Sequence, residues 1–142
     1  MERKRQNLDA SERDRLSEKI RAFLGGQGDQ IVAAYLFGSF NTTEPFFDID
    51  VAVLVAGVLD SPLDFEIDLE TTLEKLVGHT IDVRVLNKAP LSFCQEVIRS
   101  GKVILDKDPN LRADFQGRVL KQYFDFAPFR KRYLDEVANA PV

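Results

Sequence analysis

The chain has a single cysteine and a single histidine among its 142 residues. With Cys94 alone, no disulfide can form within the chain, which is typical of proteins in a reducing cytoplasm. We expect Cys94 in the core or at an interface. The one histidine, His79, excludes protein-built sites that need several imidazoles, common zinc sites among them. It follows a glycine at a predicted helix-to-strand turn, and we predict a structural role for it.

Long apolar runs and excess positive charge are also missing. No run approaches the ~20 apolar residues that cross a membrane, and the start, MERKRQNLDA, lacks the apolar segment of a secretion signal. There are 19 Lys and Arg against 23 Asp and Glu, a net charge of −4. Such a chain has no general electrostatic attraction to nucleic acid. We expect a cytoplasmic protein with no membrane contact and no direct nucleic-acid partner.

Hydrophobic residues make up 44% of the chain, and its length is close to the common size of one domain. We therefore predict a single domain over 1–142, with loose ends at 1–8 and 138–142. Cap signals and apolar periodicity indicate helices and strands in alternation. Helices are predicted over 9–25, 62–77, 90–101 and about 110–137, and strands over 31–37, 49–55, 80–86 and 103–105. This order predicts an α+β fold, a small mixed sheet with helices packed on it.

Three aspartates lie on two of the predicted strands. Asp48 and Asp50 open the strand over 49–55, and Asp82 lies in TIDVRVL. Residues i and i+2 of a strand point to the same face, so Asp48 and Asp50 aim the same way. Unneutralised carboxylates repel each other, whereas Mg²⁺ binds carboxylates together with phosphate oxygens. Three aspartates on one face could hold two metal ions ~3.5–4 Å apart, the arrangement used in phosphoryl transfer.

The pair Gly38-Ser39 follows the strand over 31–37. Glycine lets the backbone approach a ligand closely, and Ser39 could cap a short helix whose free amides favour a phosphate. Alone, a Gly-Ser pair is usually an ordinary turn, and an Asp-x-Asp pair is usually a solvated strand end. Their combination with a third aspartate, after one intervening helix, favours a site for a nucleoside triphosphate.

This pattern resembles the signature of the minimal nucleotidyltransferases of the DNA polymerase β superfamily, and the resemblance implies their fold. It covers most of the chain, including APLSFCQEVIRSGKVILDKD after the third strand. The tail KQYFDFAPFRKRYL is similar to that of members that act as antitoxins in HEPN/MNT toxin–antitoxin pairs.

The resemblance implies a role for each motif residue. Asp48 and Asp50 would bind two Mg²⁺ ions, and Asp82 would bind the catalytic one and help deprotonate the acceptor hydroxyl. Gly38 and Ser39 would hold the triphosphate of ATP. The implied reaction transfers AMP to a tyrosine of a partner HEPN ribonuclease toxin and releases pyrophosphate. The attached AMP then silences the toxin.

Two alternatives to this activity remain. The loop FNTTEPFF between Ser39 and Asp48 is shorter than is usual in the family and contains no basic residue and no glycine. This departure favours an antitoxin with a degenerate site that neutralises the toxin by binding alone. A nucleotidyltransferase acting on a small molecule is the other alternative, although no second substrate-binding domain is evident.

The terminal helix carries more large apolar residues than one small sheet can cover. A stripe is formed by Leu111, Phe115, Val119, Phe126, Tyr133 and Val137, while Tyr123, Phe124, Phe129 and Leu134 lie off it. The helix could simply complete the core. A large exposed apolar surface more often marks an interface, so we predict that this helix binds a partner or forms an oligomer. Pro128 is expected to kink it.

Overall fold

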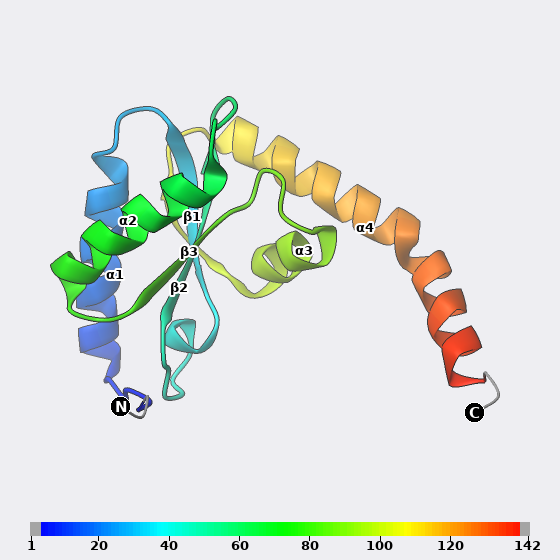
Figure 1. Ribbon diagram of the computed structural model, residues 1–142, viewed down its shortest axis with the longest axis horizontal. Helices are drawn as coiled ribbons and strands as arrows, with labels where there is room; N and C mark the ends of the chain where they lie inside the picture. The colour runs from blue at the N-terminus through cyan, green and yellow to red at the C-terminus, as the bar shows by residue number, and fades with distance from the viewer. Residues whose placement is uncertain (1–3, 140–142) are drawn as a thin grey trace.

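The computed structural model describes residues 4–139, in which four helices and one short 3₁₀ turn surround a four-stranded sheet (Figure 1). The elements are α1 (Ala10–Gly25), β1 (Ile31–Phe37), η1 (Ser39–Asn41), β2 (Ile49–Val55), α2 (Pro62–Val77), β3 (Ile81–Val85), α3 (Leu91–Ser100), β4 (Lys102–Asp106) and α4 (Pro109–Ala138). The predicted α+β fold and long terminal helix are confirmed. Within the described part of the chain, no helix is both long and apolar enough to span a membrane.

Helix capping explains where the first two long helices begin. The Asp9 side chain accepts a hydrogen bond from the Glu12 amide at the start of α1, and the Ser61 hydroxyl accepts one from the Asp64 amide at the start of α2. Pro62 occupies the first turn of α2, where its missing amide costs nothing. These are the caps that the sequence predicts, and β1 and β2 have the predicted bounds as well.

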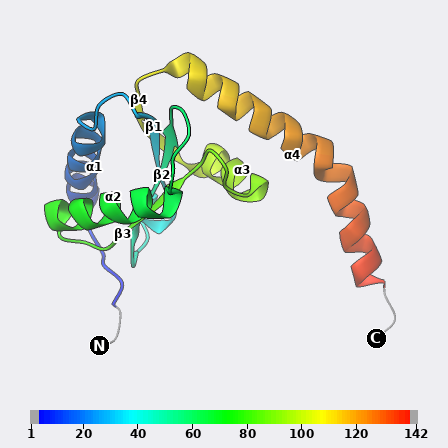
Figure 2. The same cartoon turned by 45° about the horizontal axis from the view of Figure 1, so that its top comes forward.

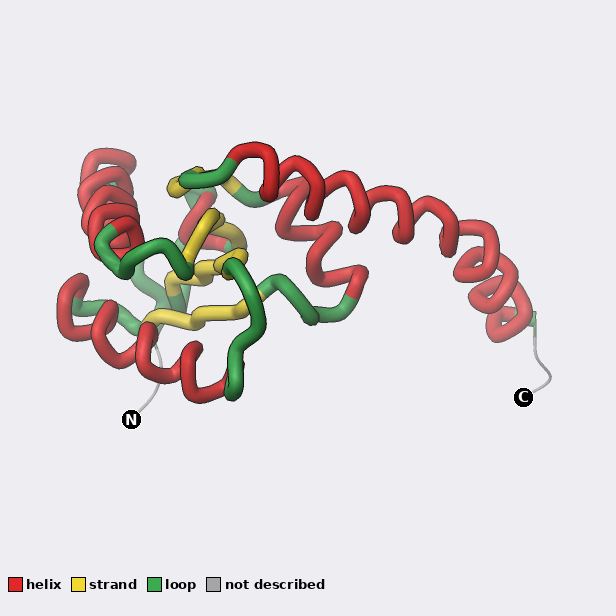
Figure 3. Tube along the Cα trace, turned by 90° about the horizontal axis from the view of Figure 1, so that it is seen from above, coloured by secondary structure: helices red, strands yellow, loops and turns green. Residues whose placement is uncertain are grey.

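The strands lie in the order β3-β2-β1-β4. Strand β1 pairs antiparallel with both β2 and β4, whereas β2 and β3 are parallel and joined through α2. Helices α1 and α2 cover one face of the sheet and α3 covers the other, as the view from above shows (Figure 3). Because side chains alternate between faces, β2 sends Ile49, Val51 and Val53 to the core beneath α1 and α2 and turns Asp50 toward the opposite face.

Three glutamates of α2 cover the outer edge of β3. The backbone amides of Ile81, Val83 and Val85 donate to the carboxylates of Glu74, Glu70 and Glu66 at 3.1, 3.3 and 2.8 Å respectively. Four residues on a helix rise about 6 Å and two residues on a strand about 6.6 Å, so the two repeats nearly match. The row satisfies amides that an edge strand would otherwise expose to another chain. It also fixes the strand that carries Asp82.

The second half of α4 extends away from the rest of the fold (Figures 1 and 2). Its first half packs through the buried Phe115 and Val119 onto α3 and the sheet. The helix continues through Pro128, and its ribbon bends in its second half (Figure 1). Six large apolar side chains beyond Tyr123 are at least 55% exposed: Phe124, Phe126, Phe129, Tyr133, Leu134 and Val137.

The predicted loose N-terminal segment is partly wrong. Residues 1–3 and 140–142 lie outside the described residues, but Gln6 forms a β-bridge with Phe46. The Gln6 amide donates to the Phe46 carbonyl at 2.7 Å, and the Phe46 amide donates back at 2.9 Å. Leu8 packs against the core. The segment before α1 therefore holds the end of the loop that precedes Asp48.

Candidate active site

The fold brings the predicted aspartates together. In the parallel register of β2 and β3, Asp50 lies directly beside Asp82. Asp48 precedes β2, and the buried Ile49 separates it from Asp50 with the predicted alternation. The negative charges of Asp82 and Asp48 both act on Asp50, so the three carboxylates lie within electrostatic reach of one another.

Gly38 lies against Asp50 from the β1 side. Phe37 is the register partner of Asp50, so the residue after it reaches the aspartate side chain. A Cβ atom on Gly38 would lie 2.2 Å from Asp50 Oδ2. Gly38 also has φ 73° and ψ −164°, a backbone conformation that only glycine adopts without strain. The Gly38 position therefore accepts no side chain while Asp50 keeps its place.

Ser39 differs from its prediction in one detail. The short turn η1 begins at Ser39 itself, Gly38 occupies the capping position, and no side chain caps the turn. The Ser39 carbonyl accepts hydrogen bonds from the amide and the hydroxyl of Thr42 at 3.0 and 2.6 Å. The cap prediction was wrong because the chain turns one residue earlier, where glycine allows a positive φ.

Burial and repulsion raise the pKa of Asp50 to about 6. The largest cause is burial of the carboxyl group, followed by the negative charges of Asp82 and Asp48, while Arg84 opposes the shift. A carboxyl group whose ionisation is disfavoured in this way is typical of a functional site, where a bound cation would favour the ionised form.

We expect Asp50→Asn to stabilise the ligand-free protein at neutral pH. A raised pKa means that protonation of Asp50 favours the folded state, so its stabilising contribution is complete below about pH 4 and lost as the pH rises through about 6. Asparagine removes the repulsion, and Tm should rise by about 2–4 °C at pH 7.5, the shift that ~1 kcal/mol gives in a chain of this size. Thermal unfolding should show this gain disappear near pH 4. An equal gain at both pH values would contradict the assigned repulsion.

The three carboxylates have the chemistry of a magnesium site but not yet its geometry. Among residues 4–139, no three Asp, Glu, His or Cys side chains converge closely enough to hold a metal ion. Asp82 Oδ1 instead lies 3.4 Å from Arg84 Nε. All three are hard oxygen donors on adjoining positions, so the residues fit a divalent cation if Asp82 turns from Arg84 toward Asp50.

The loop FNTTEPFF is firmly anchored although it is short. Phe40 and Phe46 are buried and meet edge to face with their ring centroids 5.0 Å apart. The Thr42 hydroxyl that donates to Ser39 also accepts from the Glu44 amide at 3.0 Å. Arg13 of α1 donates to several carbonyl groups of the loop. Sequence reasoning missed Arg13, although its position in the apolar stripe that continues with Leu16 is unusual for a cation.

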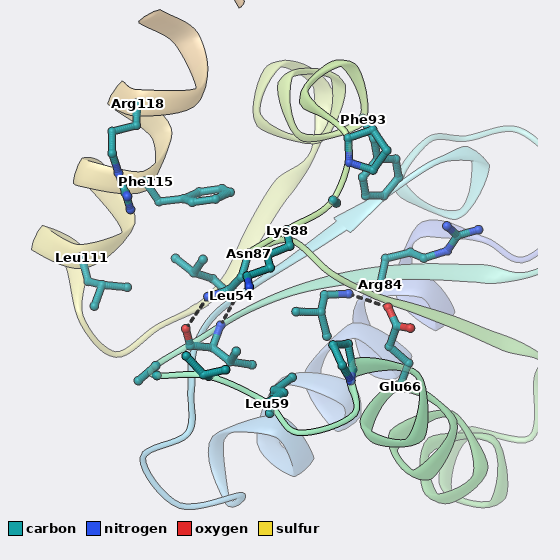
Figure 4. A pocket seen from close by; sticks show the side chains of 18 residues that line it. Leu54, Leu59, Glu66, Arg84, Asn87, Lys88, Phe93, Leu111, Phe115 and Arg118 are labelled. Carbon is teal, nitrogen blue, oxygen red and sulfur yellow. Dashed lines mark hydrogen bonds between the residues drawn. The ribbon is translucent and has the colours of Figure 1, made fainter. Parts of the chain in front are cut away.

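A cavity of about 700 Å³ lies at the carboxyl ends of β2 and β3, whereas Asp50 and Asp82 lie near the amino ends of the same strands. Figure 4 shows Arg84 from β3, Phe93 from α3 and Phe115 and Arg118 from α4 around it. Arg84 lines the cavity, pairs with Asp82 and lies 5.9 Å from the centre of the Phe93 ring. Its side chain therefore links the cavity to Asp82. The volume is within the range of small-molecule sites. No sequence pattern indicates this cavity, because its walls come from four separate segments.

Cys94 and His79, for which we predict structural roles, each contact other residues of the fold. Cys94 is buried, and its thiol donates to the Leu86 carbonyl at 3.4 Å. The His79 ring lies 5.9 Å from that of Phe46.

Comparison with known proteins gives matches over most of the chain. Residues 18–110 match the family described as polymerase beta, nucleotidyltransferase. The protein adenylyltransferase MntA of Shewanella oneidensis is 31% identical over 123 residues, which cover 84% of this chain and 85% of that protein.

Solved structures of a toxin–antitoxin pair share the fold. A structure of the tri-AMPylated Shewanella oneidensis HEPN toxin in complex with the MNT antitoxin matches with a TM-score of 0.72 and 25% identity, covering 89% of this chain and 98% of that chain. A structure of the toxin–antitoxin with AMP-PNP matches with a TM-score of 0.72 and 27% identity, covering 86% and 98%.

Proposed function

The chain belongs to the polymerase beta nucleotidyltransferase family, and from this we propose that it is an antitoxin that transfers AMP from ATP to a tyrosine hydroxyl of a partner HEPN ribonuclease toxin. The observation that carries the proposal is the contact of Asp50 with Asp82 on one side and Gly38 on the other. The relatives support this proposal. One is a protein adenylyltransferase, one structure holds an AMPylated HEPN toxin, and another was solved with AMP-PNP. Because ATP is an intracellular substrate, we infer a cytoplasmic location.

The order of the motif residues across the sheet suggests how the reactants lie. Gly38 and Ser39 follow β1, Asp50 lies on β2 and Asp82 on β3, in that spatial order. Attacking and leaving oxygens are roughly in line in phosphoryl transfer. With pyrophosphate leaving on the side of Gly38 and Ser39, the acceptor hydroxyl enters from the side of Asp82, where a carboxylate can accept its proton.

We propose that Asp48, Asp50 and Asp82 would together hold two Mg²⁺ ions. When bound, these ions would neutralise phosphate charge and lower the pKa of the acceptor hydroxyl. The carboxylates of Asp48, Asp50 and Asp82, which repel one another in the free protein, would then be neutralised by the cations.

Incubation with the partner toxin, labelled ATP and Mg²⁺ tests the proposal, and the partner should become labelled only when the metal is present. On addition of AMP-PNP and Mg²⁺, backbone amide chemical shifts should change at Gly38, Ser39 and Asp50. If the toxin is neutralised without becoming labelled, the antitoxin acts by binding alone. That second function is favoured by one observation, the lack of any basic residue in the loop beside Gly38.

The exposed half of α4 is our candidate for the toxin-binding element, and an oligomer of this chain is its alternative. Phe126, Phe129, Tyr133 and Val137 recur at three- and four-residue spacing and continue the stripe that Phe115 buries against the domain. A large exposed apolar surface of this kind favours a partner that covers the stripe.

The double variant Phe129→Glu plus Tyr133→Glu should weaken toxin binding by at least ~100-fold, the effect of losing central aromatic contacts. Isothermal titration calorimetry measures this loss, and the melting temperature should not fall because both side chains are exposed. Lys131→Glu changes the net charge by the same amount on the opposite side of the helix and serves as the control. Equal loss in both variants would contradict a specific apolar interface.

A further inference from the structure

Arg13 connects helix α1 to the loop that follows Gly38. Its side chain is only 7% exposed. One terminal nitrogen donates to the carbonyls of Phe40 and Ser39 at 2.9 and 3.3 Å, and the other donates to the carbonyl of Glu44 at 2.7 Å. Nε donates to the carbonyl of Leu8 at 2.8 Å. One guanidinium group therefore binds both ends of the loop and the segment before α1.

The chemistry of this contact requires arginine. The guanidinium carbon lies 5.7 Å from the ring centroid of Phe40 and 5.1 Å from that of Phe46, so the cation also stacks on the two buried aromatic anchors. A planar group with five donors can serve four carbonyls in fixed directions, whereas an ammonium group has three donors and no plane. Lysine could satisfy only part of this set.

We propose that Arg13 is a positioning residue for ATP, because it holds the loop of residues 39–46 in shape before the nucleotide arrives. This inference rests on the proposed function, in which Gly38 and Ser39 bind the triphosphate. The loop has no basic residue of its own, and Arg13 supports it from the side of α1. Arg13 lies before the segment that matches the family, residues 18–110, and adds to the motif residues.

A preformed loop lowers the entropic cost of binding but does not touch the reacting atoms. Arg13→Gln should therefore raise the KM for ATP about tenfold, the order expected when several hydrogen bonds to the loop are lost, and should change kcat less than about threefold. Arg13→Lys should give an intermediate KM. Steady-state AMP transfer at varied ATP concentration separates the two constants.

Leu24→Ala is the matched control for a general loss of stability. Leu24 is fully buried on the same helix and has no contact with the loop through hydrogen bonds. Its truncation should lower the melting temperature as Arg13→Gln does and leave the KM for ATP unchanged. A KM that rises equally in both variants would overturn the proposal.

A second variant tests the loop without disturbing the core. Thr42→Val removes the exposed hydroxyl that donates to the Ser39 carbonyl and accepts from the Glu44 amide. The variant should fold and raise the KM for ATP about threefold, since one local bond is lost. If Arg13→Gln does not fold, Arg13→Lys and Thr42→Val decide the question, and an unchanged KM in both overturns the proposal.

Hydrogen exchange separates this inference from the proposed function. In the ligand-free protein, Arg13→Lys should speed amide exchange at residues 39–46 and leave β3 and α2 unchanged, whether or not the wild type transfers AMP. Absence of transfer by the wild type would count against the proposed function alone. Faster exchange throughout the domain, or no increase in exchange at residues 39–46, would overturn the role of Arg13.

Discussion

Replacing Asp48 and Asp50 together with alanine should lower the rate of AMP transfer by at least ~10⁴-fold. The site then loses two of the three carboxylates that we assign to the metal ions. Each tenfold loss of rate corresponds to ~1.4 kcal/mol, so this prediction asks the pair to supply more than ~5 kcal/mol of transition-state stabilisation. Transfer of label from ATP to the toxin, measured at saturating Mg²⁺, gives the rate.

The double variant must still fold and bind the toxin for the loss to be informative. Both aspartates lie beside or on the rim of the core, and removing their repulsion should stabilise the free protein, as argued above for Asp50. Asp68→Ala plus Asp114→Ala removes the same charge from exposed positions of α2 and α4 and should leave the rate unchanged. Label transfer by the Asp48 and Asp50 variant at the control rate would disprove the assigned mechanism.

The sequence predicted the carboxylate cluster because it rests on two short-range rules. Alternation along a strand puts Asp48 and Asp50 on one side, and a strand, helix and strand in succession makes neighbours of β2 and β3. The register then places Asp82 beside Asp50. Both rules use only local patterning, so an unaligned sequence was sufficient for this part of the site.

The supporting contacts were not predictable in the same way. Glu66, Glu70 and Glu74 recur every four residues, a pattern that equally describes a solvated helix face. Only the position of α2 along the edge of β3 shows that each carboxylate accepts from a backbone amide. Arg13 lies in the apolar stripe of α1, but its carbonyl partners become evident only when the loop of residues 39–46 is folded over it.

Gly38→Ala should be as damaging as the loss of an aspartate, for a different reason. The new Cβ atom would lie 2.2 Å from Asp50 Oδ2, so the carboxylate must leave its position. We expect AMP transfer to fall by about 10³-fold, since displacing a carboxylate that we assign to the metal ions would remove several kcal/mol of charge stabilisation. The free energy of unfolding should fall by about 1–3 kcal/mol from the strained backbone alone.

Gly28→Ala separates backbone strain from collision. Gly28 has φ 70°, close to the 73° of Gly38, but a Cβ there would meet no atom within 4 Å. Both variants should lose stability in chemical denaturation, whereas only Gly38→Ala should lose AMP transfer. Similar activity in the two variants would show that Gly38 serves backbone conformation only.

The double variant Gly38→Ala plus Asp50→Ala tests the contact itself. With the carboxylate gone, the alanine at position 38 has nothing to collide with, so the second substitution should restore part of the stability that the first removes. Contacting residues commonly show such coupling of 0.5–3 kcal/mol, while distant residues are additive. The coupling should be absent when Gly28→Ala is combined with Asp50→Ala. A coupled pair identifies Gly38 as the residue whose missing side chain makes room for Asp50, which explains why the Gly-Ser and Asp-x-Asp motifs belong to one site.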